Sequence, residues 1–488
     1  MSPADDAGHG THTSSTAAGV VVKGASVSGI GKGTARGGVP SARVAMYKVC
    51  WAVGCSDMDM LAGFDQAIAD GVNFLSVSIG GPARDFFTDP IAIGAFHAMA
   101  RGVLTSCSAG NGGPRPMSVE NVAPWILTVA ATTIDRQFIT VAAFGDGSNA
   151  TGMSINTFNP KKKMYPLTSG RLAASFPGDE DIFGSARGPQ TVTPNILKPD
   201  LTAPGVDILA GYSKRASLTG YHIDNRYDVF NILSGTSMSC PHATATAAYV
   251  KSFHPDWSPA AIKSALMTTA TPIKISDNFT LLGSGSGQID PVKAVHPGLV
   301  YDIGVHSYIS FLCKQGFNNT NIGKLIGIKN FNCARIKTEP GADGINYPSM
   351  HIQLLNARDR ISAVFYRTVT NVGFGNSTYK AIVTAPKGLS VKVIPDTLYF
   401  SILHQKLSFK VVVKGPPMSE DAFVEFASLE WNDSKHTTVR SSILAIMCQS
   451  IEAIAFIVSH SPHHRDQPKC NWMHTNKEKE TSVQPLKH

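Results

Sequence analysis

The sequence has no CxxC pair among its eight cysteines, no long basic run and no long uninterrupted apolar run. Without CxxC pairs, neither a zinc ribbon nor a dithiol redox site is indicated. The densest basic run covers only residues 161–163, so the net charge of +8 predicts a solvated surface rather than a nucleic-acid groove. The most apolar late stretch, residues 443–458, is short and interrupted, and we predict a soluble protein without membrane contact.

The sequence contains features that argue against secretion and others that argue for it. The first ten residues, MSPADDAGHG, contain neither a basic n-region nor an apolar h-region, so no signal peptide is predicted. Five Asn-x-Ser/Thr sequons nevertheless suit a secreted glycoprotein. These candidate glycosylation sites are Asn149, Asn278, Asn318, Asn376 and Asn432.

The first 300 residues alternate between strand and helix patterns. Residues 43–49 (RVAMYKV) and 72–80 (VNFLSVSIG) are apolar runs on either side of a helical pattern, which Ser56 begins as N-cap and Gly71 ends. A second helix at residues 90–101 leads into a buried strand at 103–106. This βαβαβ order predicts an α/β domain with a mostly parallel sheet flanked by helices.

The pattern changes later in the chain. Ser258 and Pro259 predict the start of one more helix of the first domain. From about residue 342, GLSVKVIP, KLSFKVVV and VEFASLEW alternate apolar and polar residues, which predicts a separate all-β domain. After Met447 neither pattern continues, and residues 448–488 are predicted to form a disordered tail.

Three short motifs could carry chemistry together. GHGTHT sets His9 between glycines, and a histidine can take up and release a proton near neutral pH. SGTSMSCPH sets Ser237 on a turn before a helix, where backbone N–H groups favour a developing negative charge. SCSAGNGGP sets Asn111 after a buried strand, at the sheet edge where reacting groups collect. Singly each is also an ordinary turn; together they indicate nucleophilic catalysis.

A metal site is the alternative use of the histidines. His9, His12 and His242 could ligate a metal ion, but HxxH without a neighbouring glutamate is a weak zinc signal. We therefore expect no metal and no cofactor.

With these motifs the chain resembles the plant, cucumisin-like subtilisin-like serine proteases (subtilases, peptidase family S8). The resemblance rests on GHGTHTSSTAAG, the stretch from SARVAMYKV to SVSIGG, AGNGGP, ILKPDLTAPG, SGTSMSCPH and HPDWSPAAIKSALMTTA, and it extends from Ser2 to about Met447. It implies a subtilisin-like domain over residues 1–295, a connector over 296–342 and a fibronectin-III-like sandwich over 343–447.

The resemblance also implies roles for single residues. Ser237 would be the nucleophile, His9 the general base and Asn111 the donor to the oxyanion. Ser78 and Gly80 would contact a substrate that lies along SVSIGG as an added strand. The implied substrates are proteins or peptides, and the implied location of the family is extracellular, in the apoplast or cell wall. In an oxidising compartment, Cys50–Cys55 and Cys313–Cys333 are the candidate disulfides.

The chain departs from the family pattern near its start. The family places an aspartate tens of residues before the histidine. Only eight residues precede His9 here, and Asp5 and Asp6 are the acids among them. Asp5 matches a lead-in position without a triad role. We therefore expect an N-terminally truncated subtilase of impaired activity, and the alternative is a non-catalytic remnant that binds peptides or proteins.

Two further departures are internal. Asn111 and Ser237 are separated by 126 positions, which leaves hardly any room for the protease-associated insert of plant relatives. Ala245 stands where the family usually has a glycine, which is expected to crowd the packing beside the active site.

Overall fold

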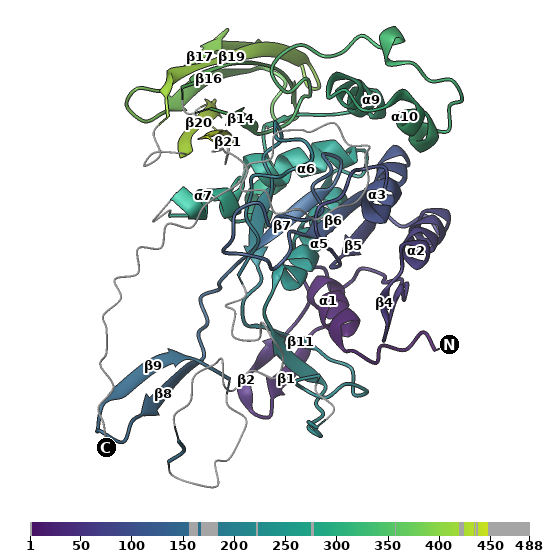
Figure 1. Cartoon of the computed structure of the whole chain (residues 1–488), viewed down its shortest axis with the longest axis vertical. Coiled ribbons are helices and arrows are strands. Elements are labelled where there is room, and N and C mark those ends of the chain that lie inside the picture. The colour runs from purple at the N-terminus through teal and green to yellow at the C-terminus, as the bar shows by residue number, and fades with distance from the viewer. Residues whose placement is uncertain are drawn as a thin grey trace, which may run out of the picture.

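Two bodies of secondary structure share the chain, a helix-covered parallel sheet and a β-sandwich that lies above it in Figure 1. The structure is a computed structural model. It describes residues 2–155, 164–166, 184–220, 223–274, 278–356, 358–418, 424–433, 435 and 438–447. The predicted tail at 448–488 lies outside the described residues.

A four-stranded parallel sheet with the order β10-β7-β6-β5 forms the centre of the first body. Its strands are β5 (Phe74–Val77), β6 (Leu104–Ser108), β7 (Leu127–Thr132) and β10 (Leu201–Pro204). Every residue of β6 is buried, whereas the edge strand β5 is half buried. The predicted α/β class with a mostly parallel sheet is confirmed.

Helices cover this sheet. They are α1 (His9–Ala18), α2 (Asp57–Ala69), α3 (Pro90–Ala100), α5 (Thr236–Phe253) and α6 (Pro259–Thr268). α5 packs against all four strands, and α1 packs against α5. The predicted caps are confirmed: the Ser56 hydroxyl accepts from the Asp59 N–H at 3.1 Å, and the Ser258 hydroxyl accepts from the Ala261 N–H at 3.0 Å.

The strand predicted at residues 43–49 is not formed. This segment pairs with no described strand, and the side chains of Val44 and Met46 are 52% and 60% exposed. Alternation of apolar residues favours an extended backbone, but a strand also needs a neighbour to pair with its N–H and C=O groups. The prediction was wrong because the residue pattern carries no information on that neighbour.

Short antiparallel pairs surround the sheet. They are β1 (Val22–Val27) with β2 (Ile30–Ala35), β3 (Cys50–Trp51) with β4 (Gly54–Cys55), β8 (Ile139–Ala143) with β9 (Asn149–Met153), and β11 (Ile208–Gly211) with β12 (Phe230–Leu233). The candidate disulfides Cys50–Cys55 and Cys313–Cys333 are both formed, with Cα–Cα distances of 4.1 and 5.4 Å.

Short elements connect the two bodies. They are α7 (Asn278–Ser284), α8 (Pro291–Ala294), β13 (Leu299–Val300), α9 (Val305–Lys314), α10 (Asn319–Ile326) and the 3-10 helix η1 (Cys333–Arg335). Tyr308 and Phe311 of α9 and Ile322 of α10 extend the hydrophobic core of the sheet body. Within the described part of the chain, no helix has the length and apolarity needed to cross a membrane.

The second body is a sandwich of two sheets, β13-β15-β19-β17 and β14-β21-β20-β16-β18. Its strands are β14 (Met350–Leu354), β15 (Arg360–Asn371), β16 (Ser377–Thr384), β17 (Ser390–Ile394), β18 (Thr397–Phe400), β19 (Lys406–Pro417), β20 (Val424–Asn432) and β21 (Val439–Met447). The three predicted strands correspond to β17, β19 and β20. The predicted all-β sandwich is confirmed.

Buried polar groups join the two bodies. Lys263 of α6 donates from Nζ to the Tyr347 hydroxyl at 2.9 Å, and that hydroxyl donates to Asp200 Oδ1 beside β10. Lys198 Nζ forms a buried ion pair with the same carboxylate at 2.7 Å. Each group in this network has a partner, as buried charges require. Tyr347 lies just before β14, and His351 on β14 bonds the Pro194 carbonyl of the sheet body, so the start of the sandwich is fixed against the sheet that carries the site below.

Candidate active site

Ser237 lies in the first turn of α5, at the carboxyl end of the parallel sheet. The turn before it is held by Asn111: the Thr236 N–H and the Thr236 hydroxyl both donate to Asn111 Oδ1, at 2.9 and 3.0 Å. Gly110 N–H donates in turn to Thr236 Oγ1 at 3.1 Å. The end of β6 and the start of α5 are thus tied together at the candidate nucleophile.

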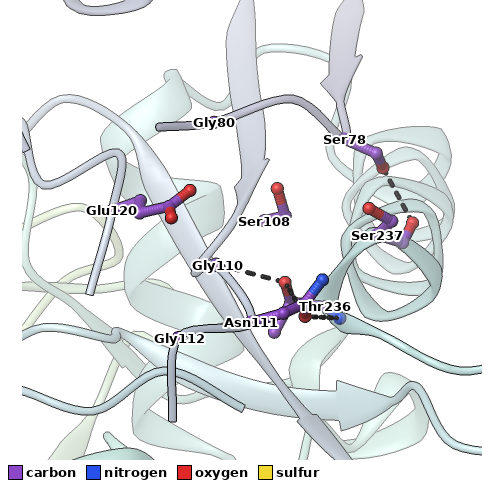
Figure 2. Close-up of a pocket in the computed structure, with 9 residues that line it drawn as sticks. All are labelled: Ser78, Gly80, Ser108, Gly110, Asn111, Gly112, Glu120, Thr236 and Ser237. Atoms are coloured by element: carbon purple, nitrogen blue, oxygen red, sulfur yellow. Dashed lines mark hydrogen bonds between the residues drawn. The ribbon is translucent and has the colours of Figure 1, made fainter. Parts of the chain in front are cut away.

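A proline inside α5 explains the position of Ser78. Pro241 has no N–H, so the Ser237 carbonyl four residues earlier receives no intrahelical hydrogen bond. Ser78 Oγ donates to this carbonyl at 2.7 Å instead, as Figure 2 shows. The segment after β5 is therefore attached to the backbone of the candidate nucleophile itself.

The Asn111 amide has a defined orientation. Because Oδ1 accepts both bonds from Thr236, the amide nitrogen Nδ2 is left to face the space beside Ser237 (Figure 2). Nδ2 makes no hydrogen bond to any described residue. A free side-chain N–H at this position is able to donate to an oxyanion formed on a carbonyl that Ser237 attacks.

A cavity of about 320 Å³ opens beside Ser237. Four residues proposed from the sequence line it, namely Ser78, Gly80, Asn111 and Ser237. Sequence reasoning missed the other lining residues, which are Ser108, Gly110, Gly112, Glu120 and Thr236. No motif or periodicity in SVENVAPW singles out Glu120; only the fold brings it to the cavity.

His9 is the first residue of α1 and does not line this cavity. No hydrogen bond joins its ring to Ser237 within the described residues. His9 is an exposed residue, but desolvation by nearby protein atoms lowers its pKa, and the charge of Asp5 opposes this by raising it. The pairing of His9 with Ser237 stays a prediction.

Asp5 caps α1 and does not bond the His9 ring. Its Oδ1 accepts from the Gly8 N–H at 2.8 Å and its Oδ2 from the N–H and hydroxyl of Thr11 at 2.7 and 2.6 Å. Burial raises the pKa of this carboxyl, but the hydrogen bonds from Thr11, Gly8 and Ala7 outweigh it and lower the pKa overall. Asp6 pairs with Lys48 at 2.6 Å. Both acids before His9 are therefore engaged elsewhere.

The other histidines of the alternative metal site fix helices. His12 is fully buried, its Nε2 bonds the carbonyls of Ile208 and Asn231 at 3.0 and 3.2 Å, and burial lowers its pKa to about 4. His242 Nδ1 bonds the Met238 carbonyl within α5 at 2.8 Å. Among the described residues, no group of three or more His, Cys, Asp or Glu side chains could hold a metal ion.

The sequons fall at different kinds of position. Asn149 on β9 and Asn376 before β16 are exposed. Asn318 is exposed, but its side chain caps α10 by accepting from the Thr320 N–H at 2.7 Å. Asn432 ends β20 and is half buried, and Asn278 begins α7.

Ala245 packs closely on Gly38, and the expected crowding beside the active site stays a prediction. A Cβ built on Gly38 would lie 2.6 Å from the Cβ of Ala245, so the extra methyl group is accommodated because residue 38 is a glycine. Together they set the close approach of α5 to the segment after β2.

Comparison with known proteins gives two family matches. The profile of the Subtilase family matches residues 1–287, and the profile of the fibronectin type-III domain matches residues 344–445. Among curated proteins, "Subtilisin-like protease SBT4.15" of Arabidopsis thaliana is 49% identical over 90% of this chain and 72% of its own length. "Subtilisin-like protease SBT4.14" of the same plant is 43% identical over 91% of this chain and 72% of its own length. The solved structure "S41 Psychrophilic Protease" matches with a TM-score of 0.37 and 21% identity over 58% of this chain and 77% of that chain.

Proposed function

The chain belongs to the subtilase family of serine endopeptidases, and on this basis we propose that it hydrolyses peptide bonds of proteins with Ser237 as nucleophile and His9 as general base. Ser237 Oγ attacks the peptide carbonyl while His9 accepts its proton. The C–N bond then breaks, His9 returns the proton to the leaving amine, and water releases the acyl group by the same steps. No cofactor takes part in this scheme.

The observation that carries the proposal is the arrangement of Asn111 beside Ser237. The amide nitrogen is turned toward the cavity by the two bonds at Oδ1, and it needs no rearrangement to donate to an oxyanion. Ser237 is at the N-terminal end of the 18-residue helix α5, whose dipole also favours negative charge. The backbone N–H and C=O groups of Ser78 and Gly80 pair with no other backbone group among the described residues, so an extended substrate can pair with them.

The surroundings of His9 support a second part of the proposal. Asp5 and Asp6 are engaged with Thr11 and Lys48, so no described carboxylate is hydrogen-bonded to the His9 ring to orient it, although the charge of Asp5 favours the protonated form of the ring. In subtilisin, a member of this family, loss of the aspartate alone lowers kcat about 3 × 10⁴-fold. We therefore propose that a polypeptide of these 488 residues alone turns over slowly.

The test compares two polypeptides. One consists of the 488 residues, and the other carries an upstream segment with the aspartate-bearing strand of the family. Hydrolysis of a quenched fluorescent peptide is expected to be about 10⁴-fold faster with the added aspartate. Ser237→Ala is expected to abolish hydrolysis in both, and Ser252→Ala, at an exposed position of the same helix, serves as the control.

Two outcomes would overturn parts of this proposal. Full activity of the 488-residue polypeptide would refute the need for a further carboxylate. An extended polypeptide that folds and binds peptides but does not cleave them would identify a non-catalytic peptide-binding remnant instead.

We also propose that the protein acts outside the cell. Two disulfides and the exposed sequons Asn149 and Asn376 suit an oxidising, glycosylating route. Expression in plant cells of the whole reading frame that contains this sequence is expected to give glycosylated protein in the apoplastic fluid. Retention of unglycosylated protein inside the cell would contradict this.

A further inference from the structure

Glu120 is the only acidic residue among those that line the cavity beside Ser237. It lies across the cavity from Ser237 in Figure 2, with its carboxylate directed toward the space in front of Ser108. The remaining lining residues are serine, threonine, asparagine and glycine, none of which carries a charge. The electrostatic character of this cavity therefore depends on one side chain.

The backbone that carries Glu120 is firmly held. The Glu120 N–H donates to the Ala109 carbonyl at 2.8 Å. The buried Asn121 amide donates to the carbonyls of Ile79 and Ser108, at 2.9 and 2.8 Å, and so bridges the ends of β5 and β6. Glu120 is thus presented from a fixed point between the two strands whose ends form the cavity walls.

Glycines on both walls leave room for this carboxylate. A Cβ built on Gly80 would collide with Oε2 of Glu120, and a Cβ built on Gly110 would lie 2.6 Å from its Cδ. Any larger residue on either wall would displace the carboxylate or close the space around it. The Glu120 carboxylate therefore fits between residues 80 and 110 because both are glycines.

The carboxylate has no partner of its own. Within the described residues it receives no hydrogen bond and forms no ion pair, and its partial burial raises the pKa of Glu120. Loss of water around an ionised carboxylate is unfavourable unless a cation or a donor replaces that water. A positively charged group that enters the cavity would supply this replacement.

We propose that the cavity beside Ser237 binds a lysine or arginine side chain of the substrate, the residue whose carbonyl Ser237 attacks, and that Glu120 selects it. This specificity rests on the proposed protease function. A carboxylate in the corresponding pocket selects basic residues in trypsin, which has an unrelated fold. The volume of about 320 Å³ is at the lower end for a ligand site and suits one long side chain.

The first test measures binding without catalysis. The Ser237→Ala polypeptide is mixed with two fluorescent peptides that end in the same sequence except for a final lysine amide or norleucine amide. Fluorescence polarisation is expected to show about 10- to 100-fold tighter binding of the lysine peptide, the range for a hydrogen bond to a charged group. A third peptide with acetyl-lysine, which is neutral, is expected to bind like the norleucine peptide.

Variants at Glu120 test whether the preference for lysine depends on its carboxylate. Glu120→Gln, added to Ser237→Ala, is expected to remove the preference for lysine. Glu425→Gln is the matched control, because Glu425 on β20 is also a half-buried carboxylate whose pKa burial raises, but it lies on the sandwich. Equal binding of the lysine and norleucine peptides, no binding of either, or a lysine preference that persists in Glu120→Gln would overturn the proposal.

Hydrolysis separates this proposal from the proposed function. A lysine preference in binding without any cleavage by the extended, Ser237-containing polypeptide would remove the protease function and keep the role of Glu120 in binding. Cleavage at equal rates after lysine and norleucine would keep the protease and overturn the role of Glu120.

Discussion

Ser237 begins a helix that is buried against all four strands of the parallel sheet, whereas His9 begins a helix at a more exposed part of the molecule. The nucleophile region, defined as α5, β6 and Asn111, has a fully buried strand and several hydrogen bonds around Thr236. The histidine region, defined as α1 and residues 43–49, has a half-buried helix and an unpaired extended segment.

Two parts of one candidate site can therefore depend on different kinds of support. In the nucleophile region, strand pairing and burial fix the reacting groups, and local changes act mainly on chemistry. In the histidine region, two anchors hold α1, the Asp5 cap at its start and the buried His12 ring one turn later. Changes there are expected to act on local stability first.

The largest expected effect comes from Asn111→Asp. The new carboxylate still accepts from Thr236, so the start of α5 is kept, but it cannot donate to an oxyanion. Loss of one such donor in subtilisin lowers kcat about 10²- to 10³-fold, and we expect at least this loss in the rate of p-nitrophenol release from an activated ester. Asn376→Asp, at an exposed position, is the control, and an unchanged rate for Asn111→Asp would contradict the oxyanion role.

His12 should make the stability of the histidine region depend on pH. Its folded pKa is about 4 against about 6.5 when unfolded, so the unfolded state binds the proton first and stability falls as the pH drops from 6.5 to 4. The full effect is about 3 kcal/mol. Urea unfolding at several pH values gives the slope of the unfolding free energy against pH. His12→Gln is expected to remove the part of this slope that comes from His12.

His351 gives the corresponding comparison in the second body. Burial lowers its pKa to about 4 as well, so a slope from this residue is expected to remain in His12→Gln. His306→Gln, at an exposed position of α9, is the control for the substitution itself. An identical slope in the parent and in His12→Gln would show that His12 is not buried in its neutral form.

Ser78→Ala should destabilise the contact between the edge strand and α5. It leaves the Ser237 carbonyl without a donor, because Pro241 cannot supply one, and an unsatisfied carbonyl costs about 1–3 kcal/mol. Urea unfolding measures the loss, and Ser78→Thr, which keeps the hydroxyl, is expected to restore most of it. Ser76→Ala on β5, whose hydroxyl contacts Cys240 Sγ at 3.6 Å and not the Ser237 carbonyl, is the comparison. An equal loss there would contradict a specific role for Ser78.

The smallest effect is expected from Asp5→Ala. Removal of the cap of α1 costs about 0.5–2 kcal/mol, and hydrogen exchange should increase in α1 but not in α5. Because the folded pKa of Asp5 is lowered, its contribution is present above the unfolded value near 4 and is lost as the pH falls below it. Equal acceleration of exchange in both helices would remove the distinction between the two regions.

Local signals made much of the fold predictable. The N-caps Ser56 and Ser258, the alternation in β17, β19 and β20 and both disulfides are found as expected. Each of these depends on a few neighbouring residues or on the family pattern. The strand predicted at residues 43–49 was wrong because strand formation depends on a pairing partner that local sequence does not specify.

The candidate site was predictable only where a motif marked it. Asn111 and Ser237 come to one cavity from short, recognisable segments, but Glu120 comes there through a loop held by Asn121. The same holds for the Ser78 hydroxyl, whose role follows from Pro241 in a helix far along the chain. Contacts between distant segments of this kind are decided by tertiary packing.

The most direct test of this account is the site of covalent labelling by a fluorophosphonate, which reacts with activated serines. The folded 488-residue polypeptide, labelled to completion and mapped by peptide mass spectrometry, is expected to carry the label on Ser237, and Ser237→Ala is expected to stay unlabelled. A label on another serine of the folded polypeptide, or an unlabelled Ser237 even after addition of the aspartate-bearing strand, would contradict the role of Ser237 as nucleophile.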